Sequence, residues 1–255
     1  MRVVKIGGRA QANPQLPIIL RDAWRAAPGS MCIVHGGGDD ISAMQRALGR
    51  EPAFIGGRRV TSEGDIELLR MVLSGVVNKR LVNALLAADI PAIGISGEDG
   101  RLIGAEMIDA ATLGFAGRPV SVNADLLHSL LNASYMPVIS PVAYDSRNPR
   151  GGALNVNGDD AAAAIAGALS ADELFLVADV KGVLDAEGEN LSTLSGESAR
   201  ELIASGIAAG GMAAKIESAQ AALAGGVASV RICDLDGLID DERGTFITLS
   251  PSVAL

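Results

Sequence analysis

The sequence predicts an α/β fold in which an open, mostly parallel sheet lies between layers of helices. Two short β-branched runs, at residues 2–6 and 31–35, each end at glycines and are followed by a helical pattern. This order of strand, glycine turn and helix is typical of a parallel α/β sheet. The 255 residues are 49% hydrophobic and 20% charged, which is enough apolar content for one large or two modest cores. That composition excludes disordered and fibrous proteins.

The first half of the chain gives a regular series of elements. We expect a strand at 2–6 and then a helix at 15–27, whose apolar side chains recur on one stripe. A second strand at 31–35 ends at three glycines, and we expect Asp39 and Asp40 to cap the helix that follows. The further elements expected in this half are a strand or hairpin at 52–61, a long helix at 62–87, a strand at 92–95, short β segments within 101–121, a helix at 124–132 and a strand at 136–142.

A softer stretch at 144–153, with the sequence SRNPRGG, predicts a boundary between two halves. We therefore divide the chain into residues 1–145 and 146–255 and expect one continuous sheet to run through both. The elements expected after the boundary are a helix at 160–169, a strand at 173–177, a turn at 179–185, helices at 197–205 and 211–224, and strands at 229–233 and 245–249.

The charge and hydropathy patterns exclude two classes of partner. Acidic residues outnumber basic ones by 30 to 21, whereas nonspecific nucleic-acid binding needs a basic surface. No window reaches about 18 apolar residues, so we expect no membrane span and a cytoplasmic location. Cys32 and Cys233 lie in apolar runs, where we expect buried thiols rather than a disulfide or a metal site.

Glycine turns and rare lysines indicate a site for an anion. Turns at 7–8 and 36–38 follow successive strands, at the sheet edge where open α/β sheets bind ligands. Neither turn fits a P-loop or a dinucleotide fingerprint, so the anion is bound in another way. Only four of the 21 basic residues are lysine, and Lys5 and Lys215 are two of those that stand near glycines. A lysine is a compact point charge that suits a transferring phosphoryl group.

Other polar residues allow both a functional and a structural interpretation. Arg59 is either a clamp for a carboxylate or a solvated loop arginine. Asp159, which follows Asn155 and Asn157 at alternate positions, is either a site residue or a carboxylate at a helix cap or first turn. Lys215 stands close to a helix N-terminus, where a cation is unfavourable unless an anion binds. We expect structural roles for the two histidines, His35 and His128.

Taken in order along the chain, several motifs resemble those of the amino acid kinase family. They are KIGG at 5–8, HGGG at 35–38, GRRVT at 57–61, VNKRLV at 77–82, GISGEDGRLI at 94–103, NVNGD at 155–159, ADVKGVLD at 178–185 and GGMAAK at 210–215. The resemblance implies an open parallel sheet whose first half binds the phosphate acceptor and whose second half binds ATP.

The resemblance also implies roles for individual residues. Lys5 and Lys215 would stabilise the transferring phosphoryl group, and Asp159 would orient both lysines. The residues expected to hold the acyl amino acid acceptor are Gly8, Gly37, Gly38, Arg59 and Asn155. Those expected to line the nucleotide are Asp179, Val180, Lys181, Gly182, Val183, Leu184, Ile207, Ala208 and Ala209. Mg²⁺ would accompany ATP, with no metal site on the protein itself.

Within the family, the motifs are most similar to those of enzymes that phosphorylate the side-chain carboxylate of N-acetyl-L-glutamate in arginine biosynthesis. The alternative is a kinase of lysine biosynthesis that acts on aminoadipate or glutamate attached to a carrier protein. A catalytically inactive sensor would lack one of Lys5, Asp159 and Lys215, and all three are present.

Two positions depart from the family pattern. Arg9 follows the first glycine pair, where the family usually has a small or apolar residue. Gly158 stands where the acetylglutamate-directed members usually carry alanine, and the lysine-pathway members can also show Gly-Asp there. Members that arginine inhibits have an extra helix before the first strand, at which this chain begins. We therefore expect a homodimer without strong arginine inhibition.

Overall fold

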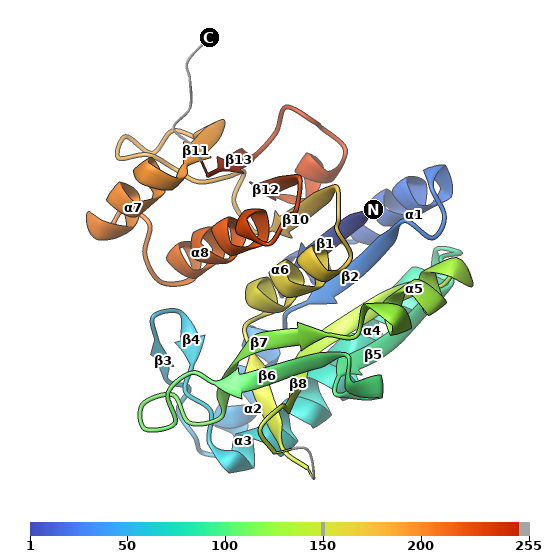
Figure 1. The fold of residues 1–255 in the computed structure, drawn as a ribbon, viewed down its shortest axis with the longest axis vertical. Coiled ribbons are helices and arrows are strands. Elements are labelled where there is room, and N and C mark those ends of the chain that lie inside the picture. The colour runs from blue at the N-terminus through green and yellow to red at the C-terminus, as the bar shows by residue number, and fades with distance from the viewer. Residues whose placement is uncertain (149–150, 250–255) are drawn as a thin grey trace.

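A computed structural model describes residues 1–148 and 151–249 of the chain. Within these residues, eleven strands form one sheet in the order β11-β13-β12-β10-β1-β2-β8-β6-β7-β9, with β5 beside β8 (Figure 1). The pairings through the middle of the sheet, from β12 through β10, β1, β2 and β8 to β5, are all parallel. Antiparallel pairs occur toward its two ends.

The strands are β1 (Arg2–Ile6), β2 (Met31–His35), β5 (Ala92–Gly97), β6 (Ile103–Met107), β7 (Ala116–Val122), β8 (Met136–Asp145), β9 (Ala153–Val156), β10 (Glu173–Val177), β11 (Thr193–Ser195), β12 (Ser229–Cys233) and β13 (Thr245–Thr248), with β3 (Phe54–Ile55) and β4 (Arg58–Arg59) in a separate hairpin. The helices are α1 (Leu16–Ala26), α2 (Gly38–Ala47), α3 (Glu63–Leu69), α4 (Asn78–Ala87), α5 (Ala124–Asn132), α6 (Gly158–Ala168), α7 (Gly196–Ala204) and α8 (Gly210–Ala224).

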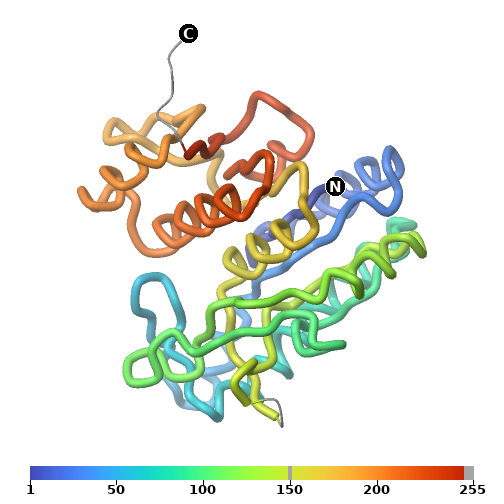
Figure 2. Tube along the Cα trace, viewed as in Figure 1, coloured from blue at the N-terminus to red at the C-terminus, as the bar shows by residue number. Residues whose placement is uncertain are grey.

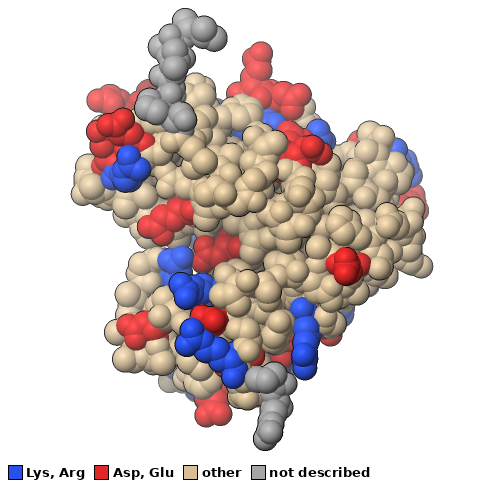
Figure 3. Space-filling model, in the orientation of Figure 1, with Lys and Arg blue, Asp and Glu red and all other residues tan. Residues whose placement is uncertain are grey.

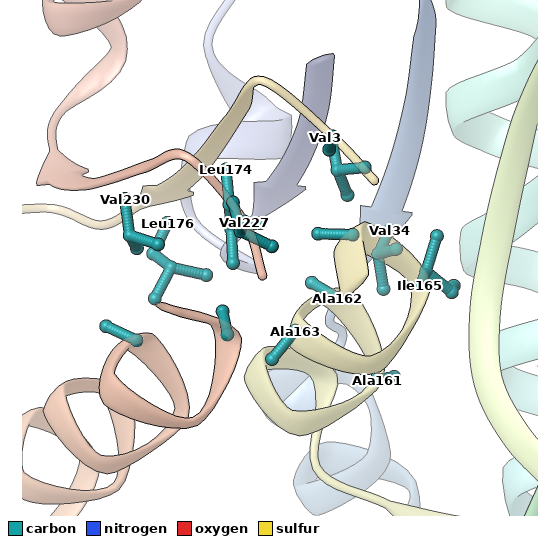
Figure 4. Close-up of a cluster of buried hydrophobic side chains, with 14 of the residues drawn as sticks. Val3, Val34, Ala161, Ala162, Ala163, Ile165, Leu174, Leu176, Val227 and Val230 are labelled. Carbon is teal, nitrogen blue, oxygen red and sulfur yellow. The ribbon is translucent and has the colours of Figure 1, made fainter. Parts of the chain in front are cut away.

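Alternating side chains of the central strands are buried on both faces of the sheet. Val3 packs with the alanine-rich α6 and with α8, whereas Val4 packs on the other face with α1 and α4. Figure 4 shows Val3, Val34 and Leu174 beside α6. Because a parallel sheet must be covered on both faces, helices form a layer on each side. The predicted α/β sandwich is confirmed.

The N-terminal strands lie in the middle of the sheet, between segments that are distant in sequence. β1 pairs with β2 on one side and with β10 on the other, so that Lys5 lies level with both Val34 and Leu176. Figure 2 shows the blue tube of residues 1–35 running between the green and the orange parts of the chain. Residues of β1 are therefore placed between the two parts of the molecule.

The predicted cap of α2 is wrong. Asp39 and Asp40 lie in the first turn of the helix, and Gly37 occupies the cap position without a side-chain cap. The Gly37 carbonyl already accepts a hydrogen bond from the Ile41 amide at 3.0 Å, so the helix starts two residues earlier than expected. This leaves backbone N–H groups at the N-terminus of α2 for another partner.

Three further details differ from the sequence-based expectations. The strands β9 and β11 were not predicted, because they are only four and three residues long. The long helix expected at 62–87 consists of α3, a π-helical segment at Arg70–Val77 and α4. Residues 149–150, within the expected boundary, and 250–255 lie outside the described residues.

The sequence analysis also made predictions about the two cysteines and about membrane-spanning helices. Cys32 and Cys233 are free and buried, as predicted, and burial raises the pKa of each thiol to about 12. Over the described ranges, no helix is both long and apolar enough to cross a membrane.

The close packing of α6 on the sheet predicts a steep cost for larger side chains on its buried face. Ala162 has no exposed surface, so Ala162→Leu should lower the free energy of unfolding by about 1–3 kcal/mol through overpacking. Ala168 is exposed on the same helix, and Ala168→Leu should change it by less than about 0.5 kcal/mol. Urea denaturation of both variants measures the difference, and equal effects would contradict the packing argument.

Candidate active site

A cavity of about 190 Å³ lies where the ends of β1 and β2 meet the N-termini of α2 and α6. Its lining includes Lys5, Gly37 and Gly38 together with Arg59, Asn155 and Asp159. Residues more than 150 positions apart therefore share one cavity. The edge formed by the carboxyl ends of parallel strands is where open α/β sheets bind ligands.

Three charged side chains meet beside this cavity. Lys5 comes from β1, Asp159 from the first turn of α6 and Lys215 from α8. The Lys5 Nζ lies 3.0 Å from Asp159 Oδ1, and the Lys215 Nζ lies 2.9 and 3.1 Å from the two oxygens of the same carboxylate. The three residues are only 9%, 5% and 7% exposed. Two buried ammonium groups thus share one carboxylate, which leaves one excess positive charge.

Local structure fixes the carboxylate in this position. Asn157 caps α6, and its side chain accepts a hydrogen bond from the Asp159 amide at 2.8 Å. The Asp159 side chain therefore lies in the first turn of α6, where the helix dipole favours a negative charge. Of the two structural interpretations of Asp159, the first-turn carboxylate is correct and the cap is wrong.

The close packing of these charges shifts their proton affinities. Burial on its own raises the pKa of the Asp159 carboxyl, but the ammonium groups of Lys5 and Lys215 outweigh it and bring that pKa to about 2. Burial, together with the charge of Lys5, lowers the pKa of Lys215 to about 8, against the opposing attraction of Asp159. At neutral pH the Lys215 side chain is therefore mostly charged, and an anion in the cavity would stabilise that charge.

The two glycine turns lie against each other at this end of the sheet. The Gly36 amide donates to the Ile6 carbonyl at 2.9 Å, and a Cβ at Gly8 would lie 3.8 Å from the Gly37 Cα. A Cβ at Gly37 would lie 2.6 Å from Cδ2 of Leu73, so any larger residue there would require the buried Leu73 side chain to shift. The N-terminus of α2 thereby presents backbone rather than side chains to the cavity, which suits an anion.

His35 holds the second glycine turn, at residues 36–38, in place. Its Nδ1 lies 2.9 Å from the Gly36 carbonyl oxygen, which also accepts a hydrogen bond from Gln11 Nε2 at 3.0 Å. The other ring nitrogen lies 3.0 Å from the Asn78 side-chain amide. Burial lowers the pKa of His35 to about 4, so the ring is neutral at physiological pH. The imidazole is hydrogen-bonded on both sides and holds the Gly36 peptide in place.

Arg59 is buried and hydrogen-bonded, so its interpretation as a solvated loop residue is wrong. Its Nη2 donates to the Gly38 carbonyl and to the Ser42 hydroxyl, each at 2.8 Å. The guanidinium carbon lies 4.6 Å from the centre of the Phe54 ring. The group is therefore held between the hairpin and α2, at the wall of the cavity.

Two further residues, which the sequence analysis missed, orient the predicted ones. Gln45 accepts a hydrogen bond from Arg59 Nη1 and donates one to Asp65 at 3.0 Å, which fixes the direction of its amide. Thr61 accepts a hydrogen bond from Asn155 Nδ2 at 2.9 Å and donates one to the Arg59 carbonyl at 3.0 Å. Thr61 belongs to the GRRVT motif, and that membership was an available signal for its role.

The residues predicted to line the nucleotide lie outside this cavity, on the loop after β10 and just before α8. A Cβ at Gly182 would lie 2.2 Å from Oδ1 of Asn190, and the Val183 amide donates to Thr245 Oγ1 at 2.8 Å. The loop is thus packed against β13, whereas Val180, Leu184 and Ile207 expose apolar side chains to solvent. Asp179 lies at a separate hollow, with its carboxylate 3.4 Å from Arg9.

The residues of the cavity do not form a metal centre by themselves. Throughout residues 1–148 and 151–249, no three His, Cys, Asp or Glu side chains are grouped so that they could hold a metal ion. Asp159, the carboxylate that lines the cavity, is occupied by two ammonium groups.

Comparison with known proteins identifies the family. The model of the amino acid kinase family matches residues 1–234. The chain belongs to the amino acid kinase family. The resemblance inferred from its motifs is thereby confirmed.

Individual members of the amino acid kinase family match the chain almost end to end. The acetylglutamate kinase of Cereibacter sphaeroides (strain ATCC 17029 / ATH 2.4.9) is 45% identical, over 96% of this chain and 86% of its own. The acetylglutamate kinase of Methanopyrus kandleri is 40% identical, over 97% of this chain and all of its own. Among solved structures, smu.665 from Streptococcus mutans UA159 has a TM-score of 0.84 and 31% identity, over 98% of each chain.

The triad of charges predicts a measurable pKa for Lys215. In a ¹⁵N-lysine NMR titration, which resolves only four side chains, the Lys215 ammonium should titrate near pH 8. Asp159→Asn removes the attracting charge, so the pKa of Lys215 should fall further in that variant. A Lys215 signal that titrates near its ordinary value of about 10.4, or one unmoved by Asp159→Asn, would contradict the geometry.

Proposed function

We propose that this protein transfers the γ-phosphoryl group of ATP to the side-chain carboxylate of N-acetyl-L-glutamate, giving N-acetylglutamyl 5-phosphate for arginine biosynthesis. The observation that carries the proposal is the placement of Lys5, Asp159 and Lys215 beside a cavity whose wall also holds Arg59 and Asn155. A site with surplus positive charge next to a carboxylate clamp suits phosphoryl transfer to a carboxylic acid.

The transfer needs positioning and charge neutralisation rather than acid–base chemistry. A carboxylate oxygen of the acceptor forms a bond to the γ-phosphorus while the bond from that phosphorus to the bridging oxygen of ADP breaks. The acceptor is already ionised at neutral pH, so no proton has to be removed. Lys5 and Lys215 neutralise the phosphoryl oxygens, and Asp159 keeps the two ammonium groups close together.

The remaining predicted residues would hold the two substrates. Arg59 and Asn155 would bind the acyl amino acid, and the glycine turns at Gly8, Gly37 and Gly38 would supply backbone amides to its reacting end and to the phosphate. The loop of residues 179–184 and the segment at 207–209 would line the nucleotide, with the exposed Val180, Leu184 and Ile207 packing against the adenine. Mg²⁺ bound to the phosphates would supply further neutralisation of their charge.

The identity of the acceptor is supported by the relatives rather than by the cavity alone. Proteins that are 40–45% identical over most of the chain carry the name acetylglutamate kinase. A carrier-linked aminoadipate or glutamate kinase is less well supported, because only the Gly158-Asp159 sequence favours it. An inactive sensor is disfavoured, because Lys5, Asp159 and Lys215 are present and meet at one point.

We also propose a cytoplasmic homodimer. The helical stretch at residues 63–87 exposes the large apolar side chains of Met71, Val76 and Leu86. Such side chains in the centre of an interface would be removed from water on pairing with a second copy.

The proposed roles of the lysines predict a large loss of turnover when either is removed. Lys5→Ala and Lys215→Ala should each lower kcat by on the order of 10²-fold or more in an ATP-dependent hydroxamate assay, because each removes one electrostatic stabiliser. Lys79→Ala is the control, since Lys79 Nζ contacts the Gly94 carbonyl and Asn78 rather than Asp159. Circular dichroism checks that each variant folds. Near-normal turnover of either site variant would contradict the assignment.

The acceptor is identified by comparing substrates in the same assay. We expect turnover with N-acetyl-L-glutamate and little with free glutamate, aspartate or N-succinylglutamate. Arg59→Lys should raise KM for the acceptor, because an ammonium group cannot hold a carboxylate in bidentate fashion. Activity on carrier-linked aminoadipate instead would indicate the kinase of lysine biosynthesis. No activity with any acceptor would favour the inactive sensor.

The pKa of Lys215 predicts the shape of the pH profile. The charged form is the active one, so kcat/KM should fall as the pH rises through about 8. With substrates bound, the phosphate charges favour the ammonium form, so the fall in kcat should occur at higher pH. In Lys215→Arg the guanidinium stays charged, and this fall should be absent from whatever activity remains. A fall at the same pH in that variant would exclude Lys215 as its cause.

A further inference from the structure

Two consecutive arginines in the short strand β4 point to opposite sides. Arg59 faces α2, where it contacts Ser42 and the Gly38 carbonyl at the wall of the cavity. Arg58 also borders the cavity, but its guanidinium reaches toward Asp160 of α6 and Glu217 of α8, as expected for neighbours in a strand. The hairpin that carries the proposed acceptor clamp is therefore also attached to the elements that carry Asp159 and Lys215.

The attachment is a hydrogen-bonded ion pair. Arg58 Nη2 donates to Asp160 Oδ2 at 3.0 Å, and the two side chains are 24% and 15% exposed. The other oxygen of Asp160 accepts a hydrogen bond from the Ser218 hydroxyl at 2.5 Å. Asp160 thus joins the β3–β4 hairpin to α8. A pair with this degree of burial is screened less by water than one at the surface.

The residues of this connection are the immediate neighbours of the catalytic ones. Asp160 follows Asp159 in the first turn of α6, and Ser218 lies three residues after Lys215 on α8. The tip of the hairpin also touches the start of α8, because a Cβ at Gly57 would lie 2.7 Å from the Gly210 carbonyl oxygen. Any shift of the hairpin therefore acts directly on the turns that hold Asp159 and Lys215.

The arrangement is visible in the figures. Figure 1 shows the β3–β4 hairpin extending away from α2 and α3 toward the near end of α8. Figure 3 shows basic side chains of the lower part of the molecule next to acidic side chains of the upper part, beside the hollow in this face. The opposite charges meet where the hairpin approaches α6 and α8.

We propose that Arg58 is a positioning residue, which through Asp160 and Ser218 couples the seating of the acceptor under the hairpin to the placement of Lys215 and Asp159. This inference rests on the proposed function. Binding of the acceptor against Arg59 holds the hairpin, and Arg58 transmits that constraint to α6 and α8. By reciprocity, a nucleotide held by Lys215 stabilises the hairpin over the acceptor.

Hydrogen exchange of the ligand-free protein tests the attachment itself. Arg58→Gln removes the charge that Asp160 faces, so the amides of residues 54–59 should exchange at least several-fold faster than in the unaltered protein. Arg118→Gln is the matched control, because Arg118 lines the same surface hollow as Arg58 and Asp160 but is exposed and pairs with Glu106. Unchanged exchange in Arg58→Gln, or an equal increase in both variants, overturns the proposal.

Calorimetry tests the coupling. The Kd of N-acetyl-L-glutamate is measured with and without saturating Mg²⁺ and a non-hydrolysable ATP analogue. In the unaltered protein and in Arg118→Gln the analogue should tighten acceptor binding by about 5-fold or more, whereas in Arg58→Gln the ratio should approach one. Arg58→Lys keeps the charge and should recover part of the coupling. A purely structural role would weaken binding equally with and without the analogue.

The outcomes separate this proposal from the proposed function. If Arg58→Gln keeps the coupling of the unaltered protein, the positioning role is wrong and the proposed function stands. If the unaltered protein binds no N-acetyl-L-glutamate, the proposed function is wrong, and the exchange of residues 54–59 still decides whether Arg58 holds the hairpin. Loss of coupling with normal folding by circular dichroism supports both.

Discussion

One buried carboxylate organises this molecule. Asp159 holds the ammonium groups of Lys5 and Lys215, which come from the central strand of the sheet and from a helix on one of its faces. Two buried like charges would repel each other strongly without a partner of opposite sign between them. The carboxylate reduces that repulsion but leaves one positive charge uncompensated. A site of this kind is pre-organised for an anion, because the cost of bringing its cations together is met during folding.

The three charged side chains can meet because the fold brings distant segments to one edge of the sheet. β1 lies between β2 and β10, so Lys5 reaches the N-terminus of α6 while the glycine turn after β1 packs on the turn after β2. Small side chains allow the approach. Gly158 is a further example, because a Cβ there would lie 3.2 Å from Cε of Lys5. An alanine at this position would therefore require the Lys5 side chain to shift by a few tenths of an ångström.

The fold and the cluster of charged residues could be predicted from the sequence, because periodicity, glycine turns and motifs are patterns among neighbouring residues. Periodicity and glycine turns predicted the central strands and most helices, and the motifs singled out Lys5, Asp159, Lys215 and Arg59. What could not be predicted depends on contacts between distant segments. Gln45 looks like an ordinary helix residue until the fold places it beside Arg59, and the motif that contains Thr61 does not show that Thr61 contacts Asn155. β9 was missed because the sequence between it and its partner β8 was interpreted as a boundary between two halves.

In two pairs of consecutive charged residues, one residue belongs to the site and its neighbour contacts another element of the fold. In β4, Arg59 lies at the cavity wall and Arg58 reaches to α6; in α6, Asp159 holds the two lysines and Asp160 receives Arg58. Side chains next to each other in a strand or in a helical turn point in different directions, so one serves the site and its neighbour ties the supporting elements together. A carboxylate at 159 without one at 160 would hold the lysines, but the hairpin would lose its hydrogen-bonded ion pair with α6. The wall that carries Arg59 and the cluster of Lys5, Asp159 and Lys215 are therefore connected by the ion pair of Arg58 and Asp160.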